Sequence, residues 1–172
     1  QSDLVIGMIG PSRKDPEYFS ASLGNAVLGQ FGMMGRIGNV VREKSGLAYY
    51  ASSSLSAGIG PGSWEVHAGV NPKNLKKAID LIEKELRRFV KSGVTKNELA
   101  DCQANYVGRL PLSFESNSGV AGALLSIERY NLGADYFLRY VDLVLGVTRD
   151  DVLATAKKYI DPDRLVIATA GP

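Results

Sequence analysis

The feature that most constrains the fold is a two-residue alternation of side chains between residues 64 and 70. Glu65 and His67 lie on one side of this extended segment. The other side carries only apolar side chains: Trp64, Val66, Ala68 and Val70. A strand with this pattern buries one face and leaves the other open. The chain is therefore expected to contain a sheet that is covered on one face only.

The flanking segments supply the remaining elements of such a sheet. Apolar or small side chains mark further strands at 4–9, 47–57 and 165–170, and the glycine-rich loop 58–62 joins two strands as a hairpin. Asp15 is expected to cap a first helix that starts at Pro16, and Thr95 with Glu98 is expected to form a capping box. Together with apolar periodicity and breakers, such caps predict helices at 16–28, 35–44, Pro72 to Gly93, Thr95 to Pro111, 116–132, 136–145 and 148–160. We therefore expect an α+β fold, a mostly antiparallel sheet with helices packed on one face.

Bulk composition indicates one ordinary globular domain covering residues 1–172, with 45% apolar and 22% charged residues. The net charge of +2 is spread along the chain with both signs interleaved, so we expect no nucleic-acid partner. No apolar run approaches the ~20 residues of a membrane span, and no secretory signal is visible, which favours a cytoplasmic protein without a membrane partner. The abrupt start in a strand suggests a piece of a longer polypeptide, in which an upstream signal would be hidden.

Few side chains in this sequence can carry catalysis alone. His67 is the only histidine and Cys102 the only cysteine, which excludes a zinc site built from three His or Cys ligands. His67 is expected to face solvent, and Cys102 lies in a helical apolar stripe and is expected to be a small core residue. No cofactor or metal is therefore expected in this chain. Glu83 and Glu85 lie beside basic residues on a predicted helix and suit local charge pairing.

The loop 58–62 could be mistaken for a phosphate-binding loop because it contains three glycines. A phosphate cradle must pass from a strand into a helix N-terminus. This loop instead joins two predicted strands and lacks the lysine of a P-loop. It is interpreted as a hairpin.

The stretch from Gly32 to Ser53, GMMGRIGNVVREKSGLAYYASS, is the most unusual part of the sequence. Arg42 is expected in the last turn of a helix that Gly46 ends, and Tyr49 just inside the next strand. A helix–turn–strand corner can direct both side chains toward one cleft. Spacing alone leaves another interpretation open, in which Arg42 is a surface charge beside Glu43 and Lys44, and Tyr49 or Tyr50 is a core aromatic residue.

This stretch, with its Gly-x-x-Gly-Arg and Val-Arg-Glu-Lys-x-Gly-Leu-Ala-Tyr segments, resembles the C-terminal-half signature of the insulinase/pitrilysin family of zinc peptidases. The segments GPGSWEVHAGVNPKNLKKAI, LPLSFESNSGVA and DPDRLVIATAGP resemble the family in the same order. The resemblance implies a processing-peptidase-like metallohydrolase domain, the zinc-free half of a two-half enzyme. It also implies that Arg42 holds a substrate carbonyl and Tyr49 donates a hydrogen bond to the developing oxyanion.

The resemblance further implies the partners. A homologous half with the motif H-x-x-E-H would hold zinc, on the same chain or on another subunit, and the two halves would enclose an unfolded peptide. This chain should then be inactive alone, and its exposed interface should favour self-association as a homodimer. Two alternatives remain: a catalytically inactive scaffold or assembly subunit related to processing-peptidase core proteins, and a free-standing module that binds an extended peptide.

Overall fold

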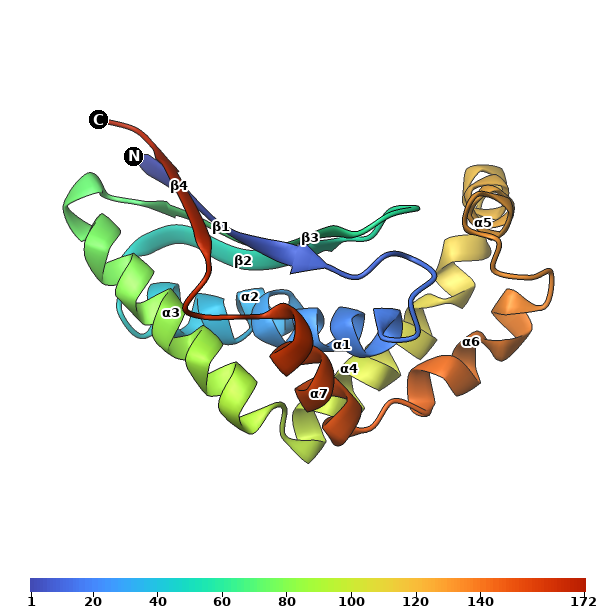
Figure 1. Cartoon of the computed structure of the whole chain (residues 1–172). Helices are drawn as coiled ribbons and strands as arrows, with labels where there is room; N and C mark the ends of the chain where they lie inside the picture. The colour runs from blue at the N-terminus through green and yellow to red at the C-terminus, as the bar shows by residue number, and fades with distance from the viewer.

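The computed structural model describes the backbone of all 172 residues and every side chain except those of residues 32–34. The described residues form one four-stranded antiparallel sheet in the order β2-β3-β1-β4. The strands are β1 (Ser2–Gly10), β2 (Ala48–Ser56), β3 (Gly62–Val70) and β4 (Val166–Ala170). The two ends of the chain lie side by side because β1 and β4 are neighbours (Figure 1).

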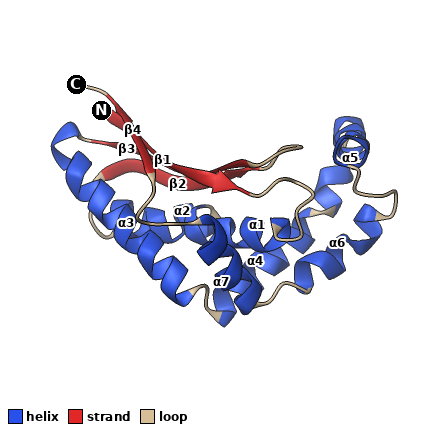
Figure 2. Cartoon of the chain, viewed as in Figure 1, coloured by secondary structure: helices blue, strands red, loops and turns tan.

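The helices form a second layer beneath the sheet, except for α5, which stands apart at one end (Figures 1 and 2). They are α1 (Tyr18–Gly29), α2 (Phe31–Gly38), α3 (Leu75–Ser92), α4 (Lys96–Arg109), α5 (Asn117–Tyr130), α6 (Tyr136–Leu145) and α7 (Arg149–Tyr159). Short helical turns lie at η1 (Asn39–Glu43), η2 (Pro72–Asn74) and η3 (Pro111–Phe114). The expected α+β class, with helices on one face of an antiparallel sheet, is confirmed.

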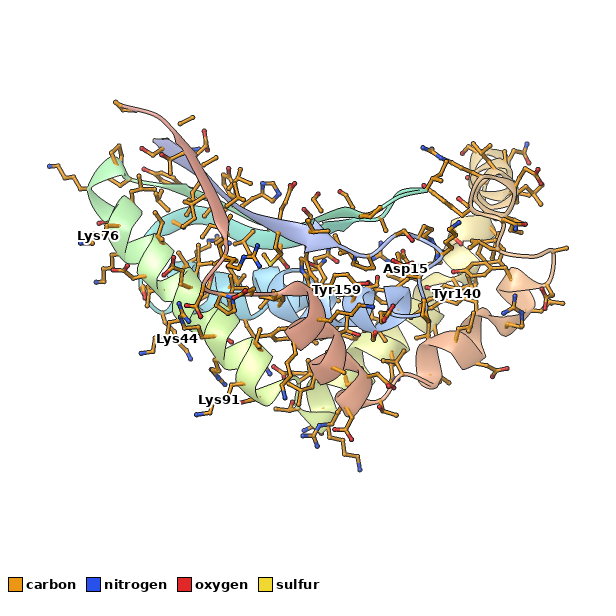
Figure 3. All side chains as sticks on the ribbon, in the orientation of Figure 1. Asp15, Lys44, Lys76, Lys91, Tyr140 and Tyr159 are labelled. Carbon is orange, nitrogen blue, oxygen red and sulfur yellow. The ribbon has the colours of Figure 1, made fainter. Side chains whose placement is uncertain are left out.

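The core lies between the two layers, as the alternation in β3 predicts. The four apolar side chains of β3, from Trp64 to Val70, are fully buried against helix residues such as Leu23 and Phe89. Glu65 and His67 are only partly buried on the opposite face. The helical basic residues are solvated as expected, since the labelled Lys76 and Lys91 of α3 point away from the protein (Figure 3). Among the described residues, no helix is long and apolar enough to cross a membrane.

A buried polar contact fixes the register between the layers. The Asn25 side-chain oxygen on α1 accepts hydrogen bonds from the Trp64 indole at 2.9 Å and from the Ser53 hydroxyl at 2.7 Å. All three residues are buried. Since buried polar groups are costly unless they are paired, this contact specifies how α1 sits on β2 and β3.

Two local predictions were wrong. Asp15 does not cap the first helix: its carboxylate instead accepts from the Ser12 backbone N–H at 2.8 Å, and the helix begins at Tyr18. The predicted helix 35–44 is displaced toward the N-terminus, because α2 begins at Phe31 and is followed by the π-helical turn η1. Gly35 has a φ of +65°, and a Cβ there would lie 2.6 Å from the Gly29 backbone nitrogen, so glycine permits this close approach.

Candidate functional site

Arg42 lies in η1, the π-helical turn that follows α2. Its side chain is 36% exposed, and Nε lies 3.8 Å from the Glu43 carboxylate. Its neighbour Val41 is fully buried and anchors the turn in the core. π-helical turns are rare and concentrate at functional sites, so this geometry marks η1 as a candidate position.

The corner after η1 is held by two backbone hydrogen bonds. The Gly46 N–H donates to the Arg42 carbonyl at 2.8 Å, and the Leu47 N–H donates to the Val41 carbonyl at 3.0 Å. Gly46 has a φ of +60°, which is the left-handed conformation that commonly ends a helix. Leu47 is buried, so the chain is pinned in the core immediately before β2. The expected helix–turn–strand corner is present.

Tyr49 lies at a β-bulge in the edge strand β2. Ala48 pairs with Val70 and Tyr50 pairs with Gly69, which leaves Tyr49 as an extra residue without a register partner on β3. Its side chain is 65% exposed, so the interpretation of Tyr49 as a core aromatic residue is wrong. No described residue forms a hydrogen bond with the Tyr49 hydroxyl, which is therefore available to a ligand.

Tyr50 is the useful comparison, because it is adjacent and of the same type. Its hydroxyl donates to the Asp3 carboxylate at 3.1 Å, and its ring lies so close to Gly69 that a Cβ there would be 2.4 Å away. Partial burial is the main cause that raises the pKa of the Tyr50 hydroxyl, and the hydrogen bond to Asp3 raises it further. Tyr50 is thus tied to the sheet, whereas Tyr49 projects from it.

The other arginine of the motif, Arg36, has a structural position that the sequence did not indicate. Its Nε and Nη2 donate to the two oxygens of Glu98 at 2.7 and 2.6 Å, and Nη1 lies 3.7 Å from Glu85. The hydrogen bonds from Arg36 lower the pKa of Glu98 to about 2. Glu85 is buried, so the expectation that it pairs only locally was incomplete: it pairs with Arg88 on its own helix and with Arg36 across the fold. This cluster joins α2, α3 and α4.

The remaining titratable candidates do not form a catalytic centre. His67 Nε2 lies 3.1 Å from the Glu65 carboxylate and 3.2 Å from the Ser54 hydroxyl on the open face. A Ser-His-acid relay needs the hydroxyl and the carboxylate on different ring nitrogens. Here both groups contact the same nitrogen, so the three residues do not form one. Cys102 is fully buried, and burial raises the pKa of its thiol to about 11. In the part of the chain whose side chains are described, no group of three His, Cys, Asp or Glu residues could hold a metal ion.

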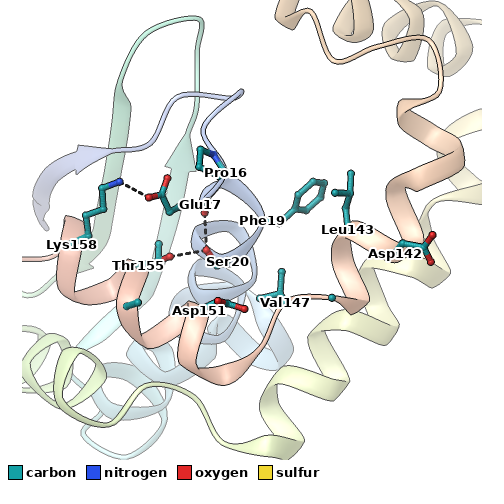
Figure 4. Close-up of a pocket in the computed structure, with 12 residues that line it drawn as sticks. Pro16, Glu17, Phe19, Ser20, Asp142, Leu143, Val147, Asp151, Thr155 and Lys158 are labelled. Carbon is teal, nitrogen blue, oxygen red and sulfur yellow. Dashed lines mark hydrogen bonds and ion pairs between the residues drawn. The ribbon is translucent and has the colours of Figure 1, made fainter.

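A cavity of about 530 Å³ lies elsewhere, in the helical layer between α1, α6 and α7. Figure 4 shows its wall, where Lys158 pairs with Glu17 and the Ser20 hydroxyl lies 2.7 Å from that of Thr155. Neither Arg42 nor Tyr49 lines it. We therefore place the candidate site at the corner and not in this cavity.

Comparisons of this chain with known proteins identify its relatives. The family described as the peptidase M16 inactive domain matches residues 1–106. The uncharacterized zinc protease SCO5738 of Streptomyces coelicolor is 30% identical over 91% of this chain, which covers 34% of that protein. The uncharacterized zinc protease YmxG of Bacillus subtilis is 29% identical over 69% of this chain, and the matched region covers 29% of YmxG. The chain thus spans about a third of the length of these curated relatives.

Solved structures agree. A peptidase M16 inactive domain from Pseudomonas fluorescens has a TM-score of 0.91 and 29% identity, over 99% of this chain and 40% of that one. A chain of complex III2 from Candida albicans has a TM-score of 0.82 at 16% identity, over 99% of this chain and 42% of that one, which shows a shared fold. The resemblance seen in the sequence is confirmed, and the chain belongs to the family of peptidase M16 inactive domains.

Proposed function

We propose that this chain is the zinc-free half of a zinc metalloendopeptidase, that it forms part of the substrate chamber, and that Arg42 and Tyr49 act on the bound peptide. The observation that carries the proposal is the position of Tyr49. A bulge sets it out of register on an edge strand, with an exposed side chain, close in sequence to the hydrogen-bonded corner that follows Arg42. Bulges next to active sites re-aim side chains in this way.

The chemistry follows from the two side chains. A phenol hydroxyl donates a hydrogen bond that strengthens as negative charge develops on a carbonyl oxygen, so Tyr49 would act mainly on the transition state. A guanidinium offers several donors in a fixed plane, so Arg42 would hold a second carbonyl of the peptide and fix its register. The described side chains offer no metal site. The partner half would therefore supply the zinc that activates water.

The test is peptide cleavage by this chain with a zinc-bearing homologous half added, either fused to it or as a separate subunit. Tyr49→Phe removes the hydroxyl and keeps the ring. Loss of one oxyanion donor lowers kcat by about 10²–10³-fold, and KM should change little. Arg42→Ala should instead raise KM more than it lowers kcat.

The matched control is Tyr50→Phe, which removes the neighbouring hydroxyl that donates to Asp3 within this chain. It should leave kcat nearly unchanged. Equal effects of Tyr49→Phe and Tyr50→Phe would refute the role proposed for Tyr49.

A second candidate function is a scaffold or assembly subunit without catalysis. The similarity of fold to a chain of complex III2 is the observation that favours it. This alternative expects a stable assembly with a homologous chain and no peptide cleavage. Specific cleavage by the assembled protein would exclude it, and its complete absence in an assembly shown to be intact would exclude the peptidase proposal.

A further inference from the structure

A second cavity, of about 460 Å³, lies between the end of α4 and the helices α5 and α6. Figure 1 shows these elements together at one end of the protein. Its volume is within the range of about 300–1,000 Å³ that is usual for small-molecule sites. Neither Arg42 nor Tyr49 lines it, so a ligand bound here would be independent of the proposed function.

The side of the cavity formed by α4 and α6 is aromatic, and its rings are held in place. The rings of Tyr106 and Phe137 line it. Phe137 packs edge-to-face on Phe114 with ring centroids 5.0 Å apart, and the Tyr106 hydroxyl lies 3.0 Å from the Ser22 hydroxyl. Rings that are already ordered lose little side-chain freedom when a ligand binds, which favours affinity.

The side formed by α5 has no bulky side chain. It consists of Gly119, Gly122 and Ala123, with the serines Ser118 and Ser126 beside them. A Cβ built on Gly122 would meet no atom within 4 Å, so the space in front of the helix is open. Rings on one side and small residues on the other suit a flat ligand, because aromatic groups prefer stacked or edge-to-face contacts.

Arg109 gives the cavity a positive charge. It lies in the last turn of α4, lines the cavity and is exposed. No described carboxylate forms an ion pair with it, and no acidic residue is among the described residues that line the cavity. Burial raises the pKa of the Tyr106 hydroxyl, and the charge of Arg109 opposes this, which places the charge near that ring. A guanidinium binds a carboxylate through two parallel hydrogen bonds, so Arg109 suits a carboxylate ligand.

The Tyr140 hydroxyl supplies a second donor from α6. Its ring lines the cavity and packs edge-to-face on Phe19, with ring centroids 5.6 Å apart. The hydroxyl forms no hydrogen bond with another described residue. Burial is the main cause that raises the pKa of Tyr140 to about 12, so the hydroxyl keeps its proton at neutral pH and can donate it to a hydrogen bond.

We infer that this cavity binds a small aromatic monocarboxylate, with its flat body between the aromatic rings and Gly122 and its carboxylate on Arg109 and the Tyr140 hydroxyl. Each part of this ligand answers one side of the cavity. An uncharged aromatic compound would leave Arg109 without a partner, and an aliphatic carboxylate would forgo the contacts with the rings.

The experiment is an NMR titration of this chain, labelled with ¹⁵N, with indole-3-acetate as the probe. We expect saturable shifts of the amides of 106–109 and 119–123 with a Kd below about 1 mM. Indole-3-acetamide has the same shape without the charge and should bind at least about 10-fold more weakly. Hexanoate, which keeps the carboxylate and lacks the ring, should also bind more weakly than indole-3-acetate.

Two substitutions test the assignment within the cavity. Arg109→Gln should weaken binding of indole-3-acetate at least about 10-fold, and Gly122→Leu should abolish it by filling the open space. The matched controls are Arg129→Gln, an exposed arginine of α5 that does not line the cavity, and Gly108→Leu, where a Cβ likewise meets no atom within 4 Å. Both controls should leave Kd unchanged.

Three results would overturn the inference: no saturable shift up to about 10 mM ligand, equal affinity for indole-3-acetamide, or unchanged affinity in Arg109→Gln. Unchanged β3 amide shifts would show that each variant is folded. If Gly122→Leu disturbs the fold, Arg109→Gln decides the matter, because that side chain is exposed. Tyr49→Phe should leave binding intact, so failure here would not affect the proposed function.

Discussion

Replacement of Arg36 by methionine tests whether the ion cluster that joins α2, α3 and α4 stabilises the fold. The substitution keeps an apolar side chain and removes the guanidinium nitrogens that contact Glu98 and Glu85. Glu98 then loses a bidentate pair with contacts of 2.7 and 2.6 Å, and Glu85 keeps its ion pair with Arg88, at 3.4 Å. One Glu85 oxygen already lacks a hydrogen bond among the described residues, so its charge becomes poorly compensated.

The expected destabilisation is about 3 kcal/mol at neutral pH. Breaking a buried pair costs about 3–5 kcal/mol, and the low end applies because Glu98 is one-third exposed and Glu85 keeps one partner. With a urea m-value of about 2 kcal/mol/M, the unfolding midpoint of Arg36→Met should fall by about 1.5 M. A loss of this size is a large fraction of the ~5–15 kcal/mol that stabilises a domain.

The pH dependence has a definite sign. The lowered pKa of Glu98, about 2 against an ordinary value of 4.5, stabilises the wild type above pH 4.5, and this contribution is lost as the pH falls toward 2. Burial raises the pKa of Glu85, so its ionised form costs stability as the pH rises through that pKa. Without Arg36 this cost grows, so the gap between wild type and Arg36→Met should be larger at pH 7 than at pH 4.

Urea unfolding at both pH values measures the effect. Glu85→Gln added to Arg36→Met should restore part of the lost stability, because it removes the buried negative charge that has lost Arg36 as a partner. Arg87→Met, which breaks an exposed pair with Asp163, is the control and should leave the midpoint unchanged. An unchanged midpoint for Arg36→Met, or a gap that widens on acidification, would refute the reasoning.

Two further substitutions test the contact between α1 and the sheet. Asn25→Ala removes the side-chain acceptor of the buried Trp64 indole N–H, while the Ser53 hydroxyl keeps the Asn25 backbone carbonyl at 3.2 Å, so the free energy of unfolding should fall by about 2 kcal/mol. Urea unfolding followed by the fluorescence of the only tryptophan measures this, and a change below about 0.5 kcal/mol would contradict it. Gly29→Ala places a Cβ 2.1 Å from the backbone nitrogen of Ser53 and should cost about 2–3 kcal/mol by the same assay. Gly108→Ala is the control, because nothing lies within 4 Å of a Cβ at that position, and it should raise the free energy of unfolding by about 0.5–1 kcal/mol. Equal effects of the two glycine substitutions would show that the close approach of Gly29 to Ser53 does not exclude a Cβ.

Local chemistry explains what could be predicted from the sequence. The alternation around Val66 predicted which face of β3 is buried, because side chains of a strand point to opposite faces with a fixed period. The capping box at Thr95 and Glu98 is present as expected, since its hydrogen bonds span only three residues. The corner carrying Arg42 and Tyr49 could be placed because Gly46 ends the helix there.

Tertiary structure decided what depends on distant partners. The bulge that exposes Tyr49 arises from pairing with Val70 and Gly69, and no local pattern specifies an unpaired residue. Arg36 looks like any helical arginine in sequence, and only the packing of α2 against α3 and α4 gives it buried carboxylates as partners.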